Sequence, residues 1–90
     1  PHNPSGTILE KEVFDGLIQL ARKHGTYVLC DEVYRYLEIN QEDRLPSIAD
    51  AYEKGISLNV MTKAFGLAGL RIGWLASQTD EFIQQVSSYK

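Results

Sequence analysis

Val60-Met61-Thr62-Lys63-Ala64-Phe65-Gly66-Leu67-Ala68-Gly69-Leu70-Arg71-Ile72-Gly73-Trp74 places a lysine eight positions before an arginine, in a segment rich in small residues. A lysine is a strong nucleophile only when its amine is deprotonated, so covalent chemistry needs a desolvated or electropositive surrounding. The apolar residues before Lys63 and the cation of Arg71 could supply both conditions. The stretch is therefore typical of a lysine that presents its amine to a carbonyl compound.

Apolar runs at residues 56–61 and 71–76 flank this stretch, and both are predicted to be strands. Only about ten residues join them, whereas a parallel crossover with a packed helix usually needs a dozen or more. We therefore predict that the strand over residues 71–76 runs antiparallel to the strand over residues 56–61. Trp74 and Leu75 are expected to belong to the core of the sheet.

A helix is predicted over residues 10–24, because Thr7 and Glu10 have the spacing of a capping box and Gly25 provides a stop. Apolar residues recur at helical spacing and predict one buried face, made of Val13, Phe14, Leu17, Ile18, Leu20 and Ala21. The continuous apolar run over residues 27–30 follows. Such a run is typical of a parallel strand that is covered on both faces.

The second half of the chain continues this alternation of helix and strand. A short helix is predicted over residues 47–53, after Pro46 and before Gly55. A last helix is predicted from Thr79 onward. Its apolar residues are expected on one face: Phe82, Ile83, Val86 and Tyr89. The sequence thus predicts an α/β fold with parallel strands, one antiparallel strand and flanking helices.

Composition excludes several classes of function for these 90 residues. The net charge is -3 and the lysines and arginines are scattered, so no basic face for nucleic acid is expected. No apolar run approaches the ~18 residues of a membrane span. Cys30 is the single cysteine, so no intrachain disulfide forms, which agrees with a reducing compartment.

Asp31 follows the apolar run directly, at the carboxyl end of a predicted strand, where α/β sheets bind their ligands. Taken alone, Asp31 would be interpreted as the cap of the next turn. The pair Asp31 and Glu32 after an apolar strand also matches the Walker B pattern of nucleotide hydrolases. That pattern is accompanied by a Gly-x-x-x-x-Gly-Lys-Ser/Thr loop, which does not occur in these residues, and it does not explain Lys63 and Arg71.

Three sequence elements follow one another along the chain: Asn3-Pro4-Ser5-Gly6, Asp31-Glu32-Val33-Tyr34, and Lys63 with Arg71 and Gly73. In this order and at this spacing they resemble the class I and II aminotransferases that depend on pyridoxal phosphate (PLP) and share the fold of aspartate aminotransferase. The resemblance covers all 90 residues. It implies that residues 1–90 are part of the large, PLP-binding domain of a longer chain.

The resemblance also implies a role for each matching residue. Lys63 would be the catalytic lysine and bind PLP as a Schiff base, and Asp31 would pair with the pyridine nitrogen. Tyr34 and Asn3 would hydrogen-bond the ring oxygen, while Arg71 would bind the phosphate. The implied activity is transfer of an amino group from an amino acid to a 2-oxo acid, in a cytoplasmic homodimer, with no metal. The isolated segment is expected to be inactive.

One departure from the family pattern concerns Val60, which stands where these enzymes usually have serine or glycine, three residues before the lysine. A valine cannot donate a hydrogen bond to phosphate.

Two alternatives of function also stay open. C–S lyases and decarboxylases of the same fold share these residues, and so does the PLP-binding sensor domain of some transcription regulators.

Overall fold

The computed structural model describes residues 1–89. Its helices are α1 (Lys11–His24), α2 (Ile48–Ala51) and α3 (Asp80–Ser88), and its strands are β1 (Val28–Asp31), β2 (Gly55–Val60) and β3 (Gly73–Ser77). Two short 3-10 helices, η1 (Gln41–Asp43) and η2 (Ala68–Leu70), lie in the loops. None of the helices within residues 1–89 is long and apolar enough to cross a membrane.

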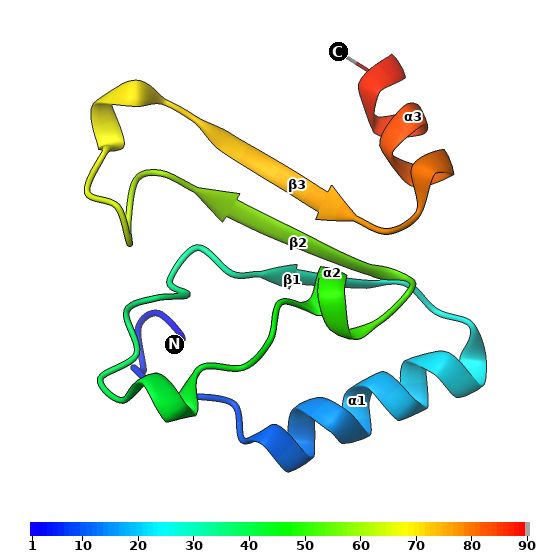
Figure 1. Cartoon of the computed structure of the whole chain (residues 1–90), viewed down its shortest axis with the longest axis horizontal. Coiled ribbons are helices and arrows are strands. Elements are labelled where there is room, and N and C mark those ends of the chain that lie inside the picture. Colours follow the sequence, from blue (N-terminus) through cyan, green and yellow to red (C-terminus); the bar gives the residue numbers. More distant parts are fainter. Residues whose placement is uncertain (90) are drawn as a thin grey trace.

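The three strands form one sheet in the order β1-β2-β3 (Figure 1). β1 is parallel to β2, with Asp31 opposite Leu58. β3 is antiparallel to β2, with Val60 opposite Gly73, so the predicted antiparallel strand is confirmed. The carboxyl ends of β1 and β2 therefore meet at one edge of the sheet, and β3 begins at that same edge.

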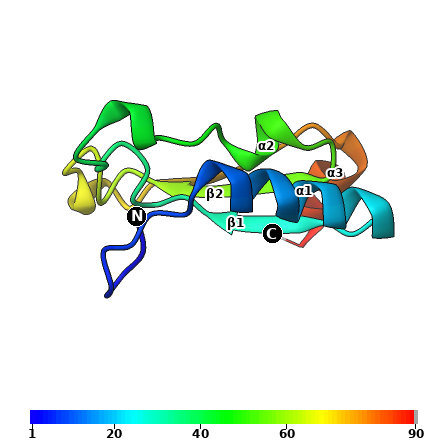
Figure 2. The same ribbon diagram turned by 90° about the horizontal axis from the view of Figure 1, so that it is seen from below.

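The core lies between α1, α2 and one face of the sheet; in Figure 2 the sheet is seen edge-on with α2 above it. Phe14, Ile18 and Ala21 of α1 pack with Ile48 and Tyr52. The Tyr52 side chain is 1% exposed, and its hydroxyl donates a 2.8 Å hydrogen bond to the Thr26 carbonyl oxygen. This bond satisfies the one polar group that the tyrosine brings into the core.

The other face of β1 is open among the described residues, and the prediction that this strand is covered on both faces is wrong. Leu29 is 65% exposed, because the side chains of a strand alternate and only Val28 and Cys30 face the helices. Three residues predicted to lie on the buried face of α1 are also about half exposed: Val13, Leu17 and Leu20. The apolar stripe of α1 is therefore wider than the surface that α2 and β1 cover, and these three residues lie outside the covered part.

The sheet's outer strand and the last helix are also less buried than predicted. Trp74 and Leu75 are 39% and 37% exposed, so they are not core residues of the described fold. Within α3, Phe82, Ile83 and Val86 are partly buried, and Phe82 lies 6.3 Å from the Tyr27 ring, measured between ring centroids. Tyr89 is 91% exposed and does not share that face.

The predicted capping box at the start of α1 is wrong. The helix begins at Lys11 with Glu10 at its N-cap, and no side chain caps it. Thr7 instead hydrogen-bonds through its hydroxyl to Ser5, with the two oxygens 2.8 Å apart, within the preceding turn. The predicted stop is confirmed, because Gly25 has a left-handed φ of 63° and its N–H donates to the Arg22 carbonyl.

α2 is shorter than the helix predicted over residues 47–53. Tyr52 has extended backbone angles and accepts a hydrogen bond from the Gly55 N–H, so β2 can begin at Gly55. This start of β2 is packed very closely on α2. A Cβ atom at Gly55 would lie 2.0 Å from the Ile48 carbonyl oxygen, so the position admits glycine only.

Candidate cofactor site

The residues predicted to bind the cofactor all belong to segments at the edge where β1 and β2 end. These segments are the N-terminal turn, the turn after β1, and the loop between β2 and β3, and they lie together in Figure 1. The predicted residues are Asn3, Asp31, Tyr34, Lys63 and Arg71. This is the edge at which open α/β sheets bind ligands.

Asn3 and Tyr34 make a direct contact between two distant segments. The Asn3 side-chain amide donates a 3.2 Å hydrogen bond to the Tyr34 hydroxyl. A cis peptide bond joins Asn3 to Pro4, and the Gly6 N–H closes the turn on the His2 carbonyl at 2.7 Å. The hydrogen bond between Asn3 and Tyr34 holds the N-terminal turn beside the turn that follows β1.

Lys63 reaches the same tyrosine from a third segment. Its Nζ lies 5.9 Å from the centroid of the Tyr34 ring. The Lys63 carbonyl accepts the Gly66 N–H at 3.2 Å, in a turn for which Gly66 takes a left-handed φ of 64°. Lys63 itself is exposed, so residues 1–89 do not provide the apolar enclosure that the sequence suggested around this amine.

Asp31 is the last residue of β1 and its side chain is exposed. Its Oδ1 accepts the Val33 N–H at 3.1 Å, so Asp31 does cap the turn that carries Tyr34. No hydrogen bond to its Oδ2 is formed within residues 1–89. One carboxylate oxygen is thus used by the turn, and the second is open to a ligand.

Arg71 closes the loop between β2 and β3. It ends η2 with a left-handed φ of 53°, which is a strained backbone conformation for a residue with a Cβ. The loop is tied at its base, because the Met61 N–H donates to Ile72 and the Leu67 N–H donates to Met61, each at 3.0 Å. The Arg71 guanidinium makes no ion pair with any residue in the described part of the chain.

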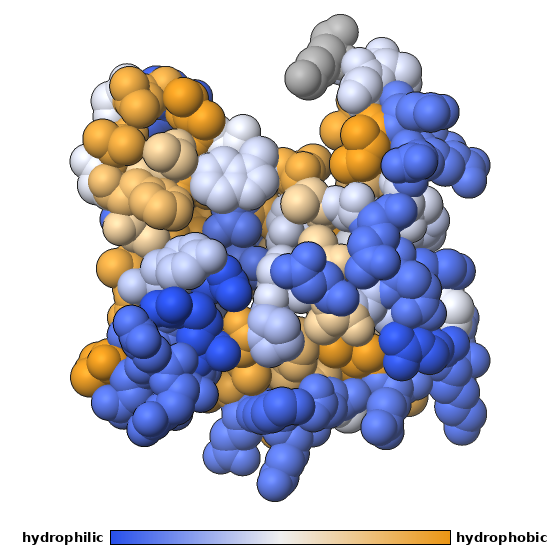
Figure 3. Space-filling view, in the orientation of Figure 1, coloured by the Kyte–Doolittle hydropathy of each residue, from blue (hydrophilic) through white to orange (hydrophobic). Residues whose placement is uncertain are grey.

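The surface of this loop is apolar. Figure 3 shows apolar side chains gathered over the connection between β2 and β3, where Phe65, Leu67, Leu70 and Ile72 are 41% to 55% exposed. The Phe65 ring also lies 6.0 Å from the ring of Tyr36, measured between centroids. The loop that carries Lys63 is therefore in contact with the segment that follows Tyr34.

Tyr36 is the second residue with a strained backbone, with a φ of 81°. Its ring lies 4.6 Å and 4.5 Å from the guanidinium carbons of Arg35 and Arg44. Its N–H donates to Glu38, which also accepts a 2.9 Å bond from Arg44. Burial alone would raise the pKa of Glu38, but the bonds from Arg44 and the backbone outweigh it, and this pKa is lowered.

Glu32 has no role in the sequence motifs of the cofactor site and matched only the Walker B pattern. It is 9% exposed, and its Oε1 accepts both the Ile48 N–H at 2.7 Å and the Ser47 hydroxyl at 3.2 Å. Its Oε2 accepts a longer bond of 3.5 Å from the Asn59 side chain. The signal in the sequence was an acidic residue directly after an apolar strand, together with a serine at a helix start.

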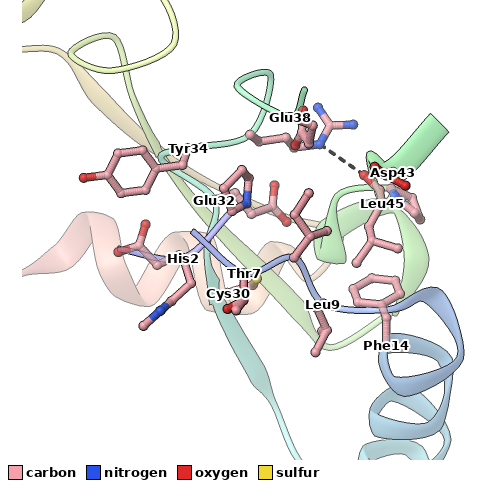
Figure 4. Close-up of a pocket in the computed structure, with 15 residues that line it drawn as sticks. His2, Thr7, Leu9, Phe14, Cys30, Glu32, Tyr34, Glu38, Asp43 and Leu45 are labelled. Atoms are coloured by element: carbon pink, nitrogen blue, oxygen red, sulfur yellow. Dashed lines mark hydrogen bonds between the residues drawn. The ribbon is translucent and has the colours of Figure 1, made fainter. Parts of the chain in front are cut away.

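A cavity of about 450 Å³ is lined by Glu32 and Tyr34 together with residues of the N-terminal segment (Figure 4). Its lining includes Asp31, Phe14, Cys30 and Leu45, but neither Lys63 nor Arg71. Burial, followed by the charges of Glu32 and Asp31, raises the pKa of the Cys30 thiol. The thiol therefore stays protonated at neutral pH and behaves as an apolar wall.

Comparisons with known proteins match this chain over its full length. The profile of the family "Aminotransferase class I and II" matches residues 1–90. The chain is 36% identical over 88 residues to an aspartate/prephenate aminotransferase of Thermus thermophilus, covering 98% of this chain and 22% of that protein. It is 31% identical over 78 residues to an aspartate aminotransferase of Thermotoga maritima, covering 86% and 21%.

The fold matches solved structures of the same kind. A PLP-dependent aminotransferase from Streptococcus suis superposes with a TM-score of 0.81 at 33% identity, covering 98% of this chain and 23% of that one. The chain spans about a fifth of the length of the curated relatives it matches. A match of this extent excludes the nucleotide-hydrolase interpretation of Asp31 and Glu32. The chain belongs to the class I and II aminotransferases, a PLP-dependent family.

Proposed function

We propose that this chain is part of the PLP-binding large domain of an aminotransferase, which transfers an amino group from an amino acid to a 2-oxo acid. The observation that carries the proposal is the meeting of Asn3, Tyr34 and Lys63, from three separate segments, at the carboxyl edge of the sheet. This arrangement places an amine beside two hydrogen-bonding groups where ligands bind.

The residues present fit the chemical groups of PLP. An aldehyde needs an amine, a protonated pyridine nitrogen needs a carboxylate, and a phosphate needs charge-assisted donors. Lys63, Asp31 and Arg71 offer these three groups. The open Oδ2 of Asp31 and the unpaired guanidinium of Arg71, within residues 1–89, leave both side chains free for a ligand.

When bound, PLP supplies the electron sink for the carbanion that forms at the substrate's α-carbon. The proposed tasks of the protein residues follow from their chemistry. Lys63 holds the cofactor and then moves the proton at that α-carbon, and Asp31 keeps the proton on the pyridine nitrogen. Tyr34 and Asn3 hydrogen-bond the ring oxygen, and Arg71 binds the phosphate through two parallel N–H donors.

The substrate class follows from the family, whose matched members act, by their names, on aspartate, prephenate, aromatic amino acids and arginine. For this protein we propose an amino acid and a 2-oxo acid as the substrate pair. The family resemblance also supports a homodimeric, cytoplasmic enzyme.

Borohydride reduction of the PLP-loaded whole protein, followed by peptide mass mapping, tests the proposal. We expect a phosphopyridoxyl group on Lys63 and none in the Lys63→Arg variant. Lys54 is the matched control, because its Nζ donates to the Gly25 carbonyl at 2.9 Å, at the opposite edge of the sheet. Modification of Lys54, or no modified lysine at all, would overturn the proposal.

A further inference from the structure

We infer that Glu32 is a positioning residue, whose buried carboxylate fixes the ends of β1 and β2 and so places Asp31 and Tyr34 for the cofactor. The inference rests on the proposed function of the site. Glu32 is not a catalytic residue, because its side chain is turned toward α2, away from Asp31. Consecutive residues of an extended chain point to opposite faces, and here Glu32 is 9% exposed whereas Asp31 is exposed.

The backbone of Glu32 joins the two strands to the turn that carries Tyr34. Its N–H donates to the Leu58 carbonyl of β2 at 2.9 Å, one step beyond the last pair of the parallel ladder. Its carbonyl accepts the Arg35 N–H at 2.9 Å, which closes the turn around Tyr34. The position of Tyr34 relative to β2 therefore depends on where Glu32 is held.

The side chain of Glu32 then holds that backbone in place from the other side. Oε1 receives two donors at the start of α2, the Ile48 N–H and the Ser47 hydroxyl. Oε2 faces Asn59, four residues before Lys63 on the strand that leads into the lysine loop. A buried carboxylate needs such donors, because an unsatisfied charge costs far more than a neutral group.

These contacts distinguish Glu32 from an ordinary core residue. The carboxylate joins β1, β2 and α2 at the same edge as the site. Of the predicted ligands of PLP, Asp31 directly precedes Glu32 and Tyr34 follows two residues later. The amide of a glutamine at this position keeps one acceptor but turns an NH₂ toward a donor, either at Ile48 or at Asn59. Glu32→Gln is therefore the variant that disturbs the contacts with the least change of shape.

Three measurements on the whole protein test the inference: the PLP dissociation constant, the visible circular dichroism of bound PLP, and the Tm without cofactor. Tyr52→Phe is the matched control, because it removes a partly buried hydrogen bond of a core residue at the opposite edge of the sheet. We expect Glu32→Gln to raise the PLP dissociation constant about threefold or more and to change the dichroism. Tyr52→Phe should lower the Tm and leave both cofactor readouts unchanged.

Two results would overturn the inference while wild-type protein binds PLP. In one, Glu32→Gln lowers only the Tm, as the control does; in the other, the control weakens PLP binding as much as Glu32→Gln. Wild-type protein that does not bind PLP at all would instead overturn the proposed function. If Glu32→Gln does not fold, Ser47→Ala removes a single donor to the same carboxylate and is judged by the same criteria.

Discussion

The Asn3 amide donates to the Tyr34 hydroxyl, so the oxygen of the tyrosine is the acceptor of this 3.2 Å bond and its own proton is directed elsewhere. A tyrosine hydroxyl has one donor and accepts through its lone pairs. When Asn3 occupies the acceptor side, the O–H of Tyr34 is left to donate to a ligand. Asn3 thus orients the proton of Tyr34.

This relationship predicts that the two residues act as a unit in PLP binding. Tyr34→Phe and Asn3→Ala should each weaken binding, and the double variant should be less impaired than the sum of both. We expect a coupling of about 0.5–1.5 kcal/mol from a double-mutant cycle of PLP dissociation constants. Tyr27→Phe serves as the control, because Tyr27 directly precedes β1 at the opposite edge of the sheet. Strict additivity would mean that Asn3 does not act through the tyrosine.

One substitution of Asp31 separates the effect of its charge on turnover from the effect of its capping hydrogen bond on stability. Asn at this position keeps an oxygen for the Val33 N–H but loses the charge, so Asp31→Asn should fold and bind PLP while turnover drops at least about tenfold. Single-turnover kinetics and thermal unfolding measure the two properties. Asp50→Asn, on the exposed side of α2, is the control. A loss of Tm with unchanged turnover would show that Asp31 is only a cap.

Substitution of Val60 tests whether this position contacts the phosphate of PLP. The Cγ1 of Val60 would lie 3.1 Å from a Cβ built on Gly73, the residue opposite on β3. Val60→Ser should tighten PLP binding by about 0.5–1.5 kcal/mol, because it adds a hydroxyl donor at a position where these enzymes usually have serine or glycine. Val60→Ala separates the hydroxyl from the loss of the two methyl groups. Equal affinities of the serine and alanine variants would show that no phosphate contact forms there.

Two glycines should respond in opposite directions to alanine. A Cβ at Gly55 meets the Ile48 carbonyl at 2.0 Å, so Gly55→Ala should cost about 1–3 kcal/mol of unfolding free energy or more. Gly16 lies inside α1 with nothing within 4 Å of its Cβ position, so Gly16→Ala should add about 0.5–1 kcal/mol. Urea unfolding measures the free energy of unfolding of both variants. A Gly55→Ala variant as stable as wild type would disprove the close contact.

The ion pair of Arg22 with Glu53 predicts a pH dependence of stability. Two hydrogen bonds of 3.1 Å and 2.9 Å join the guanidinium to the carboxylate and lower the pKa of Glu53 from its ordinary 4.5 to about 2. A lowered carboxylate pKa contributes stability above the unfolded pKa, and this contribution is lost as the pH falls from 4.5 toward 2. Both side chains are exposed, so the effect is small and weakens with salt.

Glu53→Gln should therefore flatten the fall of Tm between pH 5 and pH 2, at about 10 mM salt, where screening is weak. Glu42→Gln removes an exposed carboxylate of η1 that forms no ion pair with any of residues 1–89, and it should leave the fall unchanged. The same slope in wild type and Glu53→Gln would show that the ion pair does not affect stability.

The order and direction of the elements were predictable because they depend on local pattern. Helical spacing and a glycine stop defined α1, and the short connection after residue 61 predicted that β3 is antiparallel. The start of α1 was not predictable from the Thr7 and Glu10 spacing, because Ser5 competes for the threonine hydroxyl within its own turn. Local hydrogen bonds of this kind have no periodic signature.

The identity of the candidate site residues was predictable from the sequence, whereas many of the contacts between them and their neighbours were not. The motifs named Asn3, Tyr34 and Lys63, which the fold brings together, whereas the donors to Glu32 come from residues 15 to 27 positions away. The exposure of Leu29 was missed for a related reason. A continuous apolar run gives the number of faces that could be buried, and only the packing of other elements gives the number that are.

Because the loop after β2 is closed at its base, we expect Lys63 and Arg71 to be brought together at an earlier stage of folding than Asn3 and Asp31. Both lie within a hairpin whose ends are tied by the bond from the Met61 N–H to the Ile72 carbonyl, so their backbone positions relative to each other depend on neighbours in sequence. Isolated hairpins close in about 1–10 μs, well before strands from distant segments pair. An added or deleted residue inside this loop would move both cations at once, while the arrival of Asn3 and Asp31 beside them waits for the slower, long-range closure of the chain.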